Sequence, residues 1–195
     1  DEGHHHAIRI GSGTVCLAAA DADGMMVSFI QSNYAGFGSG VVVPGTGISL
    51  QNRAFGFSTR AGHPNQVGPG KRPFHTIIPG FVMGADGPSM AFGLMGGPMQ
   101  AQGHLQMMLR THVWGQDPQM AADAPRWRVI AGLDVAIEAT TQPQTVSKLA
   151  DMGHRVMVEP DTAGFGFGGA QLIRKIGDVY IAGSDPRKDG MAAGF

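Results

Sequence analysis

Thr14 follows the small residues Gly11-Ser12-Gly13 and opens an apolar run that continues to Ala20. If the chain is cleaved just before Thr14, this residue gains a free α-amine beside its hydroxyl, which supplies a nucleophile together with its own base. Ser12 is an alternative nucleophile in the same segment. The simpler interpretation makes Thr14 a β-branched residue at the start of a strand, and these residues by themselves favour it.

Two apolar runs of strand length would position this threonine. They cover 14–20 and 25–31 and are joined by Asp21-Ala-Asp-Gly24, which predicts a hairpin. The glycine-rich residues 33–40 follow, and they form either a loop that approaches a ligand or an ordinary turn. Residues 55–72 lack periodicity and predict a long surface loop, a kind of segment that often carries function.

The remaining chain alternates between short apolar runs and two longer helical patterns. We expect strands near 41–43, 48–52, 74–82, 89–94, 127–130, 133–139, 155–158, 170–176 and 179–182, and helices near 100–114, 118–124 and 142–152. In the first helix Leu105, Met108, Leu109 and Val113 have helical spacing, which predicts its buried face, and its methionines are expected to fill the core. This order predicts an α+β fold, with either two sheets covered by helices or a single sheet.

The composition limits the class of protein. With 195 residues and 43% hydrophobic content the chain can build one sizeable core, and the low charged content of 15% suggests that another chain covers part of its surface. The net charge of −1 gives no electrostatic case for binding nucleic acid or an anionic membrane, and no apolar run is long enough to span a bilayer. The single cysteine, Cys16, excludes an internal disulfide and is expected to be a buried, inert thiol.

Eight histidines raise the question of a metal site. His4, His5 and His6 are adjacent and cannot all reach one ion from a helix or strand, so we interpret residues 1–13 as a leader, a linker or an unprocessed segment. The other histidines are scattered without paired ligand spacing, which argues against a metal-binding module. We expect no metal and no cofactor, and the compartment stays open between periplasm and cytoplasm.

Several segments, in order along the chain, carry a family resemblance. From Thr14 to Phe195 the sequence resembles the small, C-terminal subunit of the γ-glutamyltranspeptidase family, including its cephalosporin (glutaryl) acylase branch. The matching segments are 14–24, Phe37-Gly-Ser-Gly-Val-Val-Val-Pro-Gly-Thr-Gly-Ile48, Gln51-Asn-Arg53, Gly68-Pro-Gly-Lys-Arg-Pro73, Gly96-Gly97, Asp123-Ala-Pro-Arg-Trp127 and Ser184-Asp-Pro-Arg187.

The resemblance implies an N-terminal-nucleophile hydrolase with a four-layer αββα sandwich. Residues 14–195 would be the small-subunit part, and a large subunit from the same self-cleaving precursor would complete the domain. Cleavage between Gly13 and Thr14 would free Thr14 to attack a side-chain amide and form an acyl-enzyme, which water or an amine acceptor resolves.

The resemblance also implies roles for individual residues. Ser32 would lie beside the nucleophile, the backbone N–H groups of Gly96 and Gly97 would form an oxyanion hole, and Asn52 would line the substrate pocket. Local hydrogen bonding in a strand or turn is the alternative interpretation of Ser32 and Asn52.

Departures from the family pattern concern the substrate. Gly56 stands where γ-glutamyl enzymes hold the substrate's α-amino group with a carboxylate, and His75 and Thr76 replace a pair of serines that binds the substrate carboxylate. Tyr34 replaces an asparagine, and Arg53 adds a positive charge where an amide is common. These changes favour an acyl group with a terminal carboxylate and no α-amine, such as glutaryl. An unprocessed, non-catalytic homologue that binds ligands in the same pocket is the alternative.

Overall fold

The computed structural model describes residues 13–160 and 166–195. The His4–His6 run, Ser12 and most of the expected leader lie outside the described residues. The strands are β1 (Val15–Ala20), β2 (Met26–Gln31), β3 (Pro79–Gly84), β4 (Gly87–Met95), β5 (Trp127–Ala131), β6 (Asp134–Glu138), β7 (Arg155–Glu159), β8 (Gly169–Ile176) and β9 (Val179–Ser184). The helices are α1 (Met99–Met108), which a π-helical turn extends over Leu109–Val113, α2 (Pro118–Asp123) and α3 (Pro143–Asp151), and a 3-10 turn covers Arg53–Gly56.

The chain forms two compact units. Among the described residues, the first contains 13–15 and Gln31–His75, and the second contains Cys16–Ile30 and the chain from Thr76 onward. The mixture of helices and sheets confirms the predicted α+β class.

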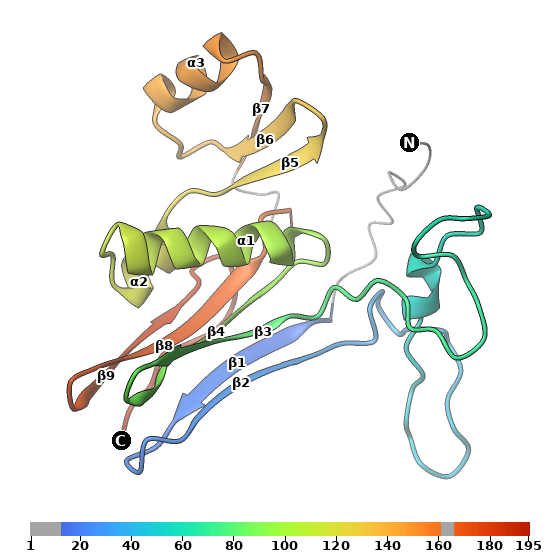
Figure 1. Cartoon of the computed structure of the whole chain (residues 1–195). Helices are drawn as coiled ribbons and strands as arrows, with labels where there is room; N and C mark the ends of the chain where they lie inside the picture. Colours follow the sequence, from blue (N-terminus) through green and yellow to red (C-terminus); the bar gives the residue numbers. More distant parts are fainter. Residues whose placement is uncertain (1–12, 161–165) are drawn as a thin grey trace. The chain divides into compact units, whose positions relative to one another are not determined.

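A four-stranded antiparallel sheet forms the centre of the second unit, with strand order β3-β4-β8-β9. Within this unit, α1 and α2 lie on one face of the sheet and the β1–β2 hairpin lies on the other (Figure 1). Both contacts are close: a Cβ on Gly103 of α1 would meet the Leu94 side chain at 2.6 Å, and a Cβ on Gly93 would stand 2.3 Å from Sγ of Cys16. Strand β4 is therefore buried on both faces, and its residues Met90 to Met95 are all buried.

A smaller sheet, β5-β6-β7, lies beyond α1 in the second unit (Figure 1). Strands β5 and β6 are antiparallel, while β6 and β7 are parallel and are connected through α3. Two glutamines of α1, one turn apart, bind the backbone of β5. Gln102 accepts from the Val129 N–H at 2.7 Å, and Gln106 accepts from the Trp127 N–H at 3.1 Å and donates to the Trp127 carbonyl at 2.8 Å. These side chains satisfy an otherwise unpaired strand edge.

This arrangement corrects the predicted buried face of α1. Leu105 and Val113 are exposed, at 51% and 68%, whereas the buried residues of α1 are Met99, Gln100, Gly103, His104, Gln106 and Met107. The helix buries glutamines because they hydrogen-bond to neighbouring backbone; Gln100, for example, accepts from the Ile78 N–H at 2.9 Å. The prediction that the helix methionines fill the core is confirmed for Met107, which is buried in the core cluster, and Met108 packs against it.

The first unit contains mostly turns and loops. The prediction of a buried strand at 41–43 is wrong: only an isolated bridge joins Val42 to Ser49, and Val41 and Val42 are exposed. No neighbouring strand within the described residues extends that bridge into a sheet. The expected strand at 74–82 begins only at Pro79, whereas residues 55–72 are largely irregular, as predicted.

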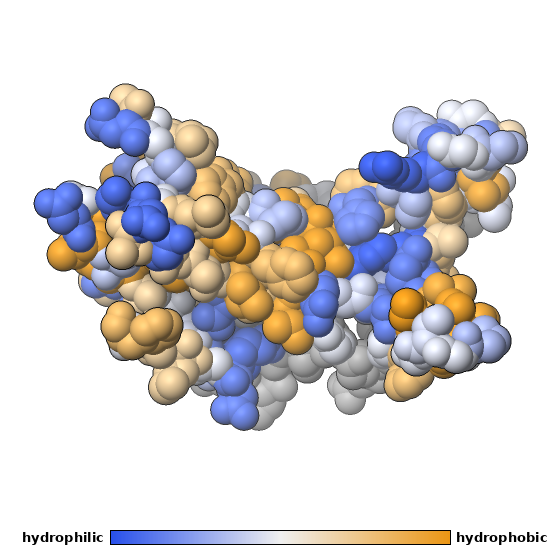
Figure 2. All heavy atoms as spheres, turned by 90° about the horizontal axis from the view of Figure 1, so that it is seen from below, coloured by the Kyte–Doolittle hydropathy of each residue, from blue (hydrophilic) through white to orange (hydrophobic). Residues whose placement is uncertain are grey.

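The hairpin's outer face is apolar and uncovered. Leu17, Val27 and Phe29 are 44%, 42% and 46% exposed, while Met26 and Ile30 on the inner face are buried. Figure 2 views the molecule from below and shows apolar atoms gathered on this side. In the part of the chain that the structure describes, no helix is long and apolar enough to cross a bilayer.

Candidate active site

Thr14 immediately precedes β1, and the hairpin register places it opposite Ser32. The Asp21 N–H donates to the Met25 carbonyl at 3.0 Å, and two strands of six residues each leave this turn. Counting back from this turn along two strands of equal length sets Val15 opposite Gln31, and we infer by extension that Thr14 lies opposite Ser32. Residues directly opposite each other in antiparallel strands share a face, so the two hydroxyl side chains are cross-strand neighbours.

The Ser32 hydroxyl receives two hydrogen bonds. Nη2 of Arg53 donates to Ser32 Oγ at 2.6 Å and to the Ser32 carbonyl at 3.2 Å, and the Tyr34 N–H donates to the same hydroxyl at 3.3 Å. The Arg53 guanidinium also lies over the Tyr34 ring, 5.6 Å from its centroid. Tyr34 has a φ of +78°, a left-handed conformation that is uncommon for a non-glycine residue. These contacts bring three of the predicted site residues together.

Asn52 holds the loop that follows Ser32. Its side-chain oxygen accepts from the Ala35 N–H at 3.1 Å, and its own N–H donates to the Asn33 carbonyl at 3.1 Å. This is the local bonding that the alternative interpretation of Asn52 expects. A role for Asn52 in the substrate pocket stays a prediction.

Gly96 and Gly97 form the sharp turn between β4 and α1. Their φ values are +136° and +60°, and the Gln100 N–H donates to the Gly97 carbonyl at 3.0 Å. A Cβ on Gly96 would stand 3.0 Å from Cα of Gly168, while Gly97 has open space around its Cα. Two consecutive glycines in left-handed conformations allow a tight strand-to-helix turn, and the role of their N–H groups in an oxyanion hole stays a prediction.

The other predicted substrate residues belong to different units of the chain. His75 is exposed and ends the first unit, and Thr76 is buried and belongs to the second. Gly56 ends the 3-10 turn, where a Cβ would stand 3.4 Å from the Phe74 carbonyl oxygen. Their binding roles stay predictions.

Sequence reasoning missed a buried ionic network. Arg126 and Asp185 form an ion pair whose side chains are both 0% exposed, and Arg187 binds Glu138 through two hydrogen bonds of 2.6 Å. Arg126 also donates to the Phe167 carbonyl at 3.0 Å, directly before Gly168. The signal was present, because both arginines follow a proline in two of the segments that carry the family resemblance.

Cys16 is half-buried rather than fully buried as predicted, and the burial it has raises the pKa of its thiol to about 11. We expect iodoacetamide at pH 8 to label Cys16 roughly 100-fold more slowly in the folded protein than in guanidinium. In the folded protein only about one Cys16 thiol in a thousand is ionised at this pH. Peptide mass spectrometry over time measures the rate. Labelling at equal rates in the two states would contradict the burial of this thiol.

The described residues contain no group of three or more histidine, cysteine, aspartate or glutamate side chains that could hold a metal ion.

Comparison with known proteins identifies the family. The γ-glutamyltranspeptidase family model matches residues 2–195. The chain is 39% identical over 194 residues to the glutathione hydrolase-like YwrD proenzyme of Bacillus subtilis, covering 95% of this chain and 36% of that protein. It is 37% identical over 188 residues to the oxamate amidohydrolase proenzyme of Klebsiella pneumoniae, covering 93% and 35%. The chain thus spans about a third of the length of these relatives.

Solved structures agree on the fold. Cephalosporin acylase from Bacillus halodurans superimposes with a TM-score of 0.84 at 49% identity, covering 90% of this chain and 33% of that one. γ-Glutamyltranspeptidase from Pseudomonas nitroreducens superimposes with a TM-score of 0.79 at 24% identity, covering 92% of this chain and 98% of that one. The predicted N-terminal-nucleophile hydrolase fold is therefore confirmed, and the chain belongs to the γ-glutamyltranspeptidase family.

Proposed function

We propose that this chain is the nucleophile-bearing part of an amidohydrolase or acyltransferase that uses Thr14 through an acyl-enzyme. The observation that carries the proposal is the position of Thr14 directly before β1, opposite Ser32, in a member of this family. A threonine that begins a chain combines nucleophile and base in one residue.

The chemistry divides among few groups. After cleavage between Gly13 and Thr14, the α-amine takes the proton of the Thr14 hydroxyl, and the oxygen attacks the amide carbonyl of the substrate. The N–H groups of Gly96 and Gly97 stabilise the negative charge that develops on the carbonyl oxygen. Collapse of the tetrahedral intermediate expels the amine, and water or a second amine then releases the acyl group.

A large partner chain from the same precursor completes the enzyme in this proposal. The chain spans only about a third of its relatives, whose names describe them as proenzymes. The uncovered apolar face of the hairpin supports the proposal, because apolar surface of this kind marks an interaction site.

The substrate is a side-chain amide of the γ-glutamyl or glutaryl type, and we favour glutaryl. At Gly56 no carboxylate can pair with a substrate ammonium, and leaving such a charge unpaired in a buried site is costly. The names of the relatives refer to glutathione, oxamate and cephalosporin, which carry different leaving amines. The identity of the leaving amine is therefore a separate question from the acyl group.

Intact-mass analysis with N-terminal sequencing tests the nucleophile. The precursor segment upstream of this chain is coexpressed with it, and we expect a mature chain that begins at Thr14. A chain that keeps its upstream residues and still binds glutarate would instead support the alternative, an unprocessed binding protein.

Substrate preference is tested with two chromogenic amides. We expect glutaryl 4-nitroanilide to be hydrolysed with at least about tenfold higher kcat/KM than γ-glutamyl 4-nitroanilide, since the γ-glutamyl ammonium finds no carboxylate at position 56. Initial rates on the processed enzyme measure the ratio, with oxamate as a third substrate. A clear preference for the γ-glutamyl compound would overturn the glutaryl assignment and leave the amidohydrolase class intact.

A further inference from the structure

We infer that Arg53 is a positioning residue that acts through Ser32: it occupies an acceptor site of the Ser32 hydroxyl and so makes Ser32 a hydrogen-bond donor toward Thr14. This inference rests on the proposed function, because it concerns the same nucleophile. It differs from the predicted role of Arg53, which was direct contact with the acyl group.

The first step of the argument counts hydrogen bonds. A serine hydroxyl has one donor proton and two acceptor lone pairs. Nη2 of Arg53 at 2.6 Å and the Tyr34 N–H at 3.3 Å both donate to Ser32 Oγ. With both acceptor positions taken, the hydroxyl can contribute only its own proton to a further hydrogen bond.

The second step concerns direction. Ser32 follows the last residue of β2, and the hairpin register places it directly across from Thr14 on the same face. The remaining proton of Ser32 is then the group that this hydroxyl can present to Thr14 across the hairpin. A donated hydrogen bond at Thr14 orients its hydroxyl or its amine, whereas an acceptor there would compete for the proton that the amine must remove.

The third step explains why Arg53 stays in place. Arg53 as a residue is only 7% exposed, its Nη2 also binds the Ser32 carbonyl at 3.2 Å, and its guanidinium lies over the Tyr34 ring. The backbone N–H of Arg53 donates to the side-chain oxygen of Gln51. A planar guanidinium held at several points has little freedom to swing toward a substrate.

Three substitutions separate the donor from the charge. Arg53→Met removes both, Arg53→Gln keeps an N–H donor without the charge, and Arg53→Lys keeps the charge and an N–H donor. We expect kcat per titrated active site to fall about 10- to 100-fold for methionine and by less than about tenfold for glutamine and lysine, with KM for glutaryl 4-nitroanilide nearly unchanged.

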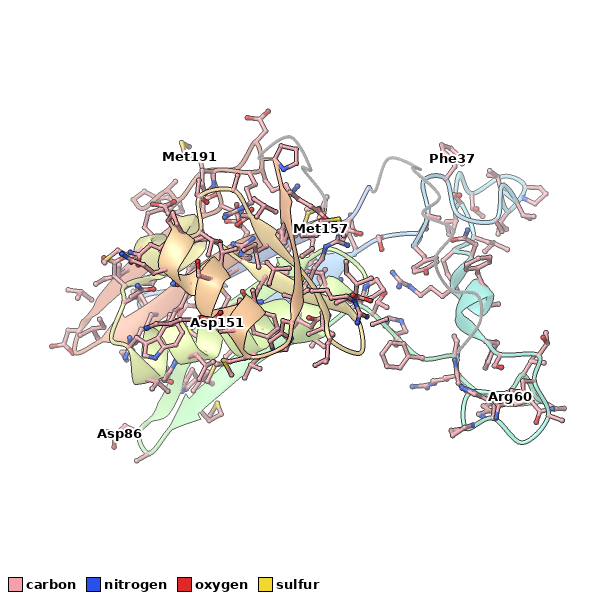
Figure 3. The ribbon with its side chains drawn as sticks, turned by 90° about the horizontal axis from the view of Figure 1, so that it is seen from above. Phe37, Arg60, Asp86, Asp151, Met157 and Met191 are labelled. Carbon is pink, nitrogen blue, oxygen red and sulfur yellow. The ribbon has the colours of Figure 1, made fainter. Side chains whose placement is uncertain are left out.

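Arg60→Met is the matched control. Arg60 belongs to the same unit as Arg53 and is exposed. Figure 3 shows it on a loop away from the one that carries Phe37. We expect this variant to have wild-type kcat. Normalising each rate to the burst of nitroaniline counts only correctly folded sites. If Arg53→Met lowered only the fraction of folded protein, kcat per site would stay unchanged, and that result would overturn the inference.

A double-mutant cycle with Ser32→Ala decides between action through Ser32 and action on substrate. We expect Arg53→Met to cost less than about twofold in the Ser32→Ala background, because the hydroxyl it orients is gone. Equal, multiplicative losses in both backgrounds would overturn the inference.

Substrate dependence gives a second, independent readout. Valeryl 4-nitroanilide has the chain length of the glutaryl compound without its carboxylate. We expect Arg53→Met to reduce kcat for both compounds by the same factor. A rise in KM confined to the glutaryl compound would show direct binding and overturn the positioning role.

If the wild-type enzyme forms no acyl-enzyme on Thr14, the proposed function fails together with this inference. Multiplicative losses in the double-mutant cycle, with an intact acyl-enzyme, defeat this inference alone.

Discussion

Replacing Thr14 by alanine is expected to lower the kcat of amide hydrolysis by at least about 1000-fold, because the substitution removes the only atom that bonds to the substrate carbon. The same change should prevent cleavage between residues 13 and 14, so that the upstream segment stays attached. Denaturing gels and intact mass report cleavage, and nitroaniline release reports hydrolysis.

Two further variants sharpen this test. Thr14→Ser keeps the hydroxyl and should retain both cleavage and measurable hydrolysis, while Ser12→Ala removes the alternative nucleophile and should change neither. An active, cleaved Thr14→Ala protein, or loss of both activities in Ser12→Ala, would move the nucleophile away from Thr14.

Replacing Asp185 by asparagine is expected to destabilise the fold by about 3–5 kcal/mol, because it leaves the buried Arg126 charge without its partner. All four acceptor positions of this carboxylate are used. Oδ2 receives Arg126 and the Ala170 N–H at 2.7 Å, and Oδ1 receives the Arg187 N–H at 2.9 Å and its Nη1 at 3.1 Å. Chemical denaturation of the processed complex, followed by intrinsic fluorescence, measures the loss.

A surface ion pair supplies the control for Asp185. Asp134 also accepts two hydrogen bonds from an arginine, Arg155, but on the protein surface, so Asp134→Asn should leave the denaturation midpoint nearly unchanged. Equal shifts for the two aspartates would contradict the argument from burial.

The pH dependence of the free energy of unfolding shows whether the ionised Asp185 carboxylate stabilises the fold. Burial by itself raises the pKa of the Asp185 carboxyl, but Arg126 and the hydrogen bonds from Ala170 and Arg187 together hold it below its ordinary value. This stabilisation is therefore complete above the pKa of an unfolded aspartate and disappears as the pH falls through the lower, folded value. Asp185→Asn should remove that part of the acid sensitivity.

The hairpin and most strands of the second unit could be predicted from sequence because alternation and turn residues are local signals. The buried face of α1 could not, since Gln102 and Gln106 face inward to satisfy the edge of β5, which is distant in the sequence. The valines at 41–43 have strand propensity, but they find no partner strand among the described residues. Strand propensity is a property of single residues, but a strand forms only where a second strand is available for backbone hydrogen bonds.

The candidate site divides in the same way. Thr14, Ser32 and the glycine pair were predicted from motif order, and the hairpin register brings the two hydroxyl residues into opposition. The contact between Arg53 and Ser32 joins residues 21 positions apart through a loop that has no periodicity, so no local pattern indicated it. The Arg126–Asp185 pair spans 59 positions and depends on the complete sheet.

The order of the central sheet also has a consequence for synthesis on the ribosome. Strand β4 pairs on one side with β8, residue Met95 with Gly169 and Met90 with Arg174. Until the ribosome has released residues up to Ile176, one edge of an apolar strand has no backbone partner. Nascent chains that end before β8 therefore expose an aggregation-prone edge, and the turn at Gly96 and Gly97 acquires its neighbour Gly168 only after more than 70 further residues have been translated.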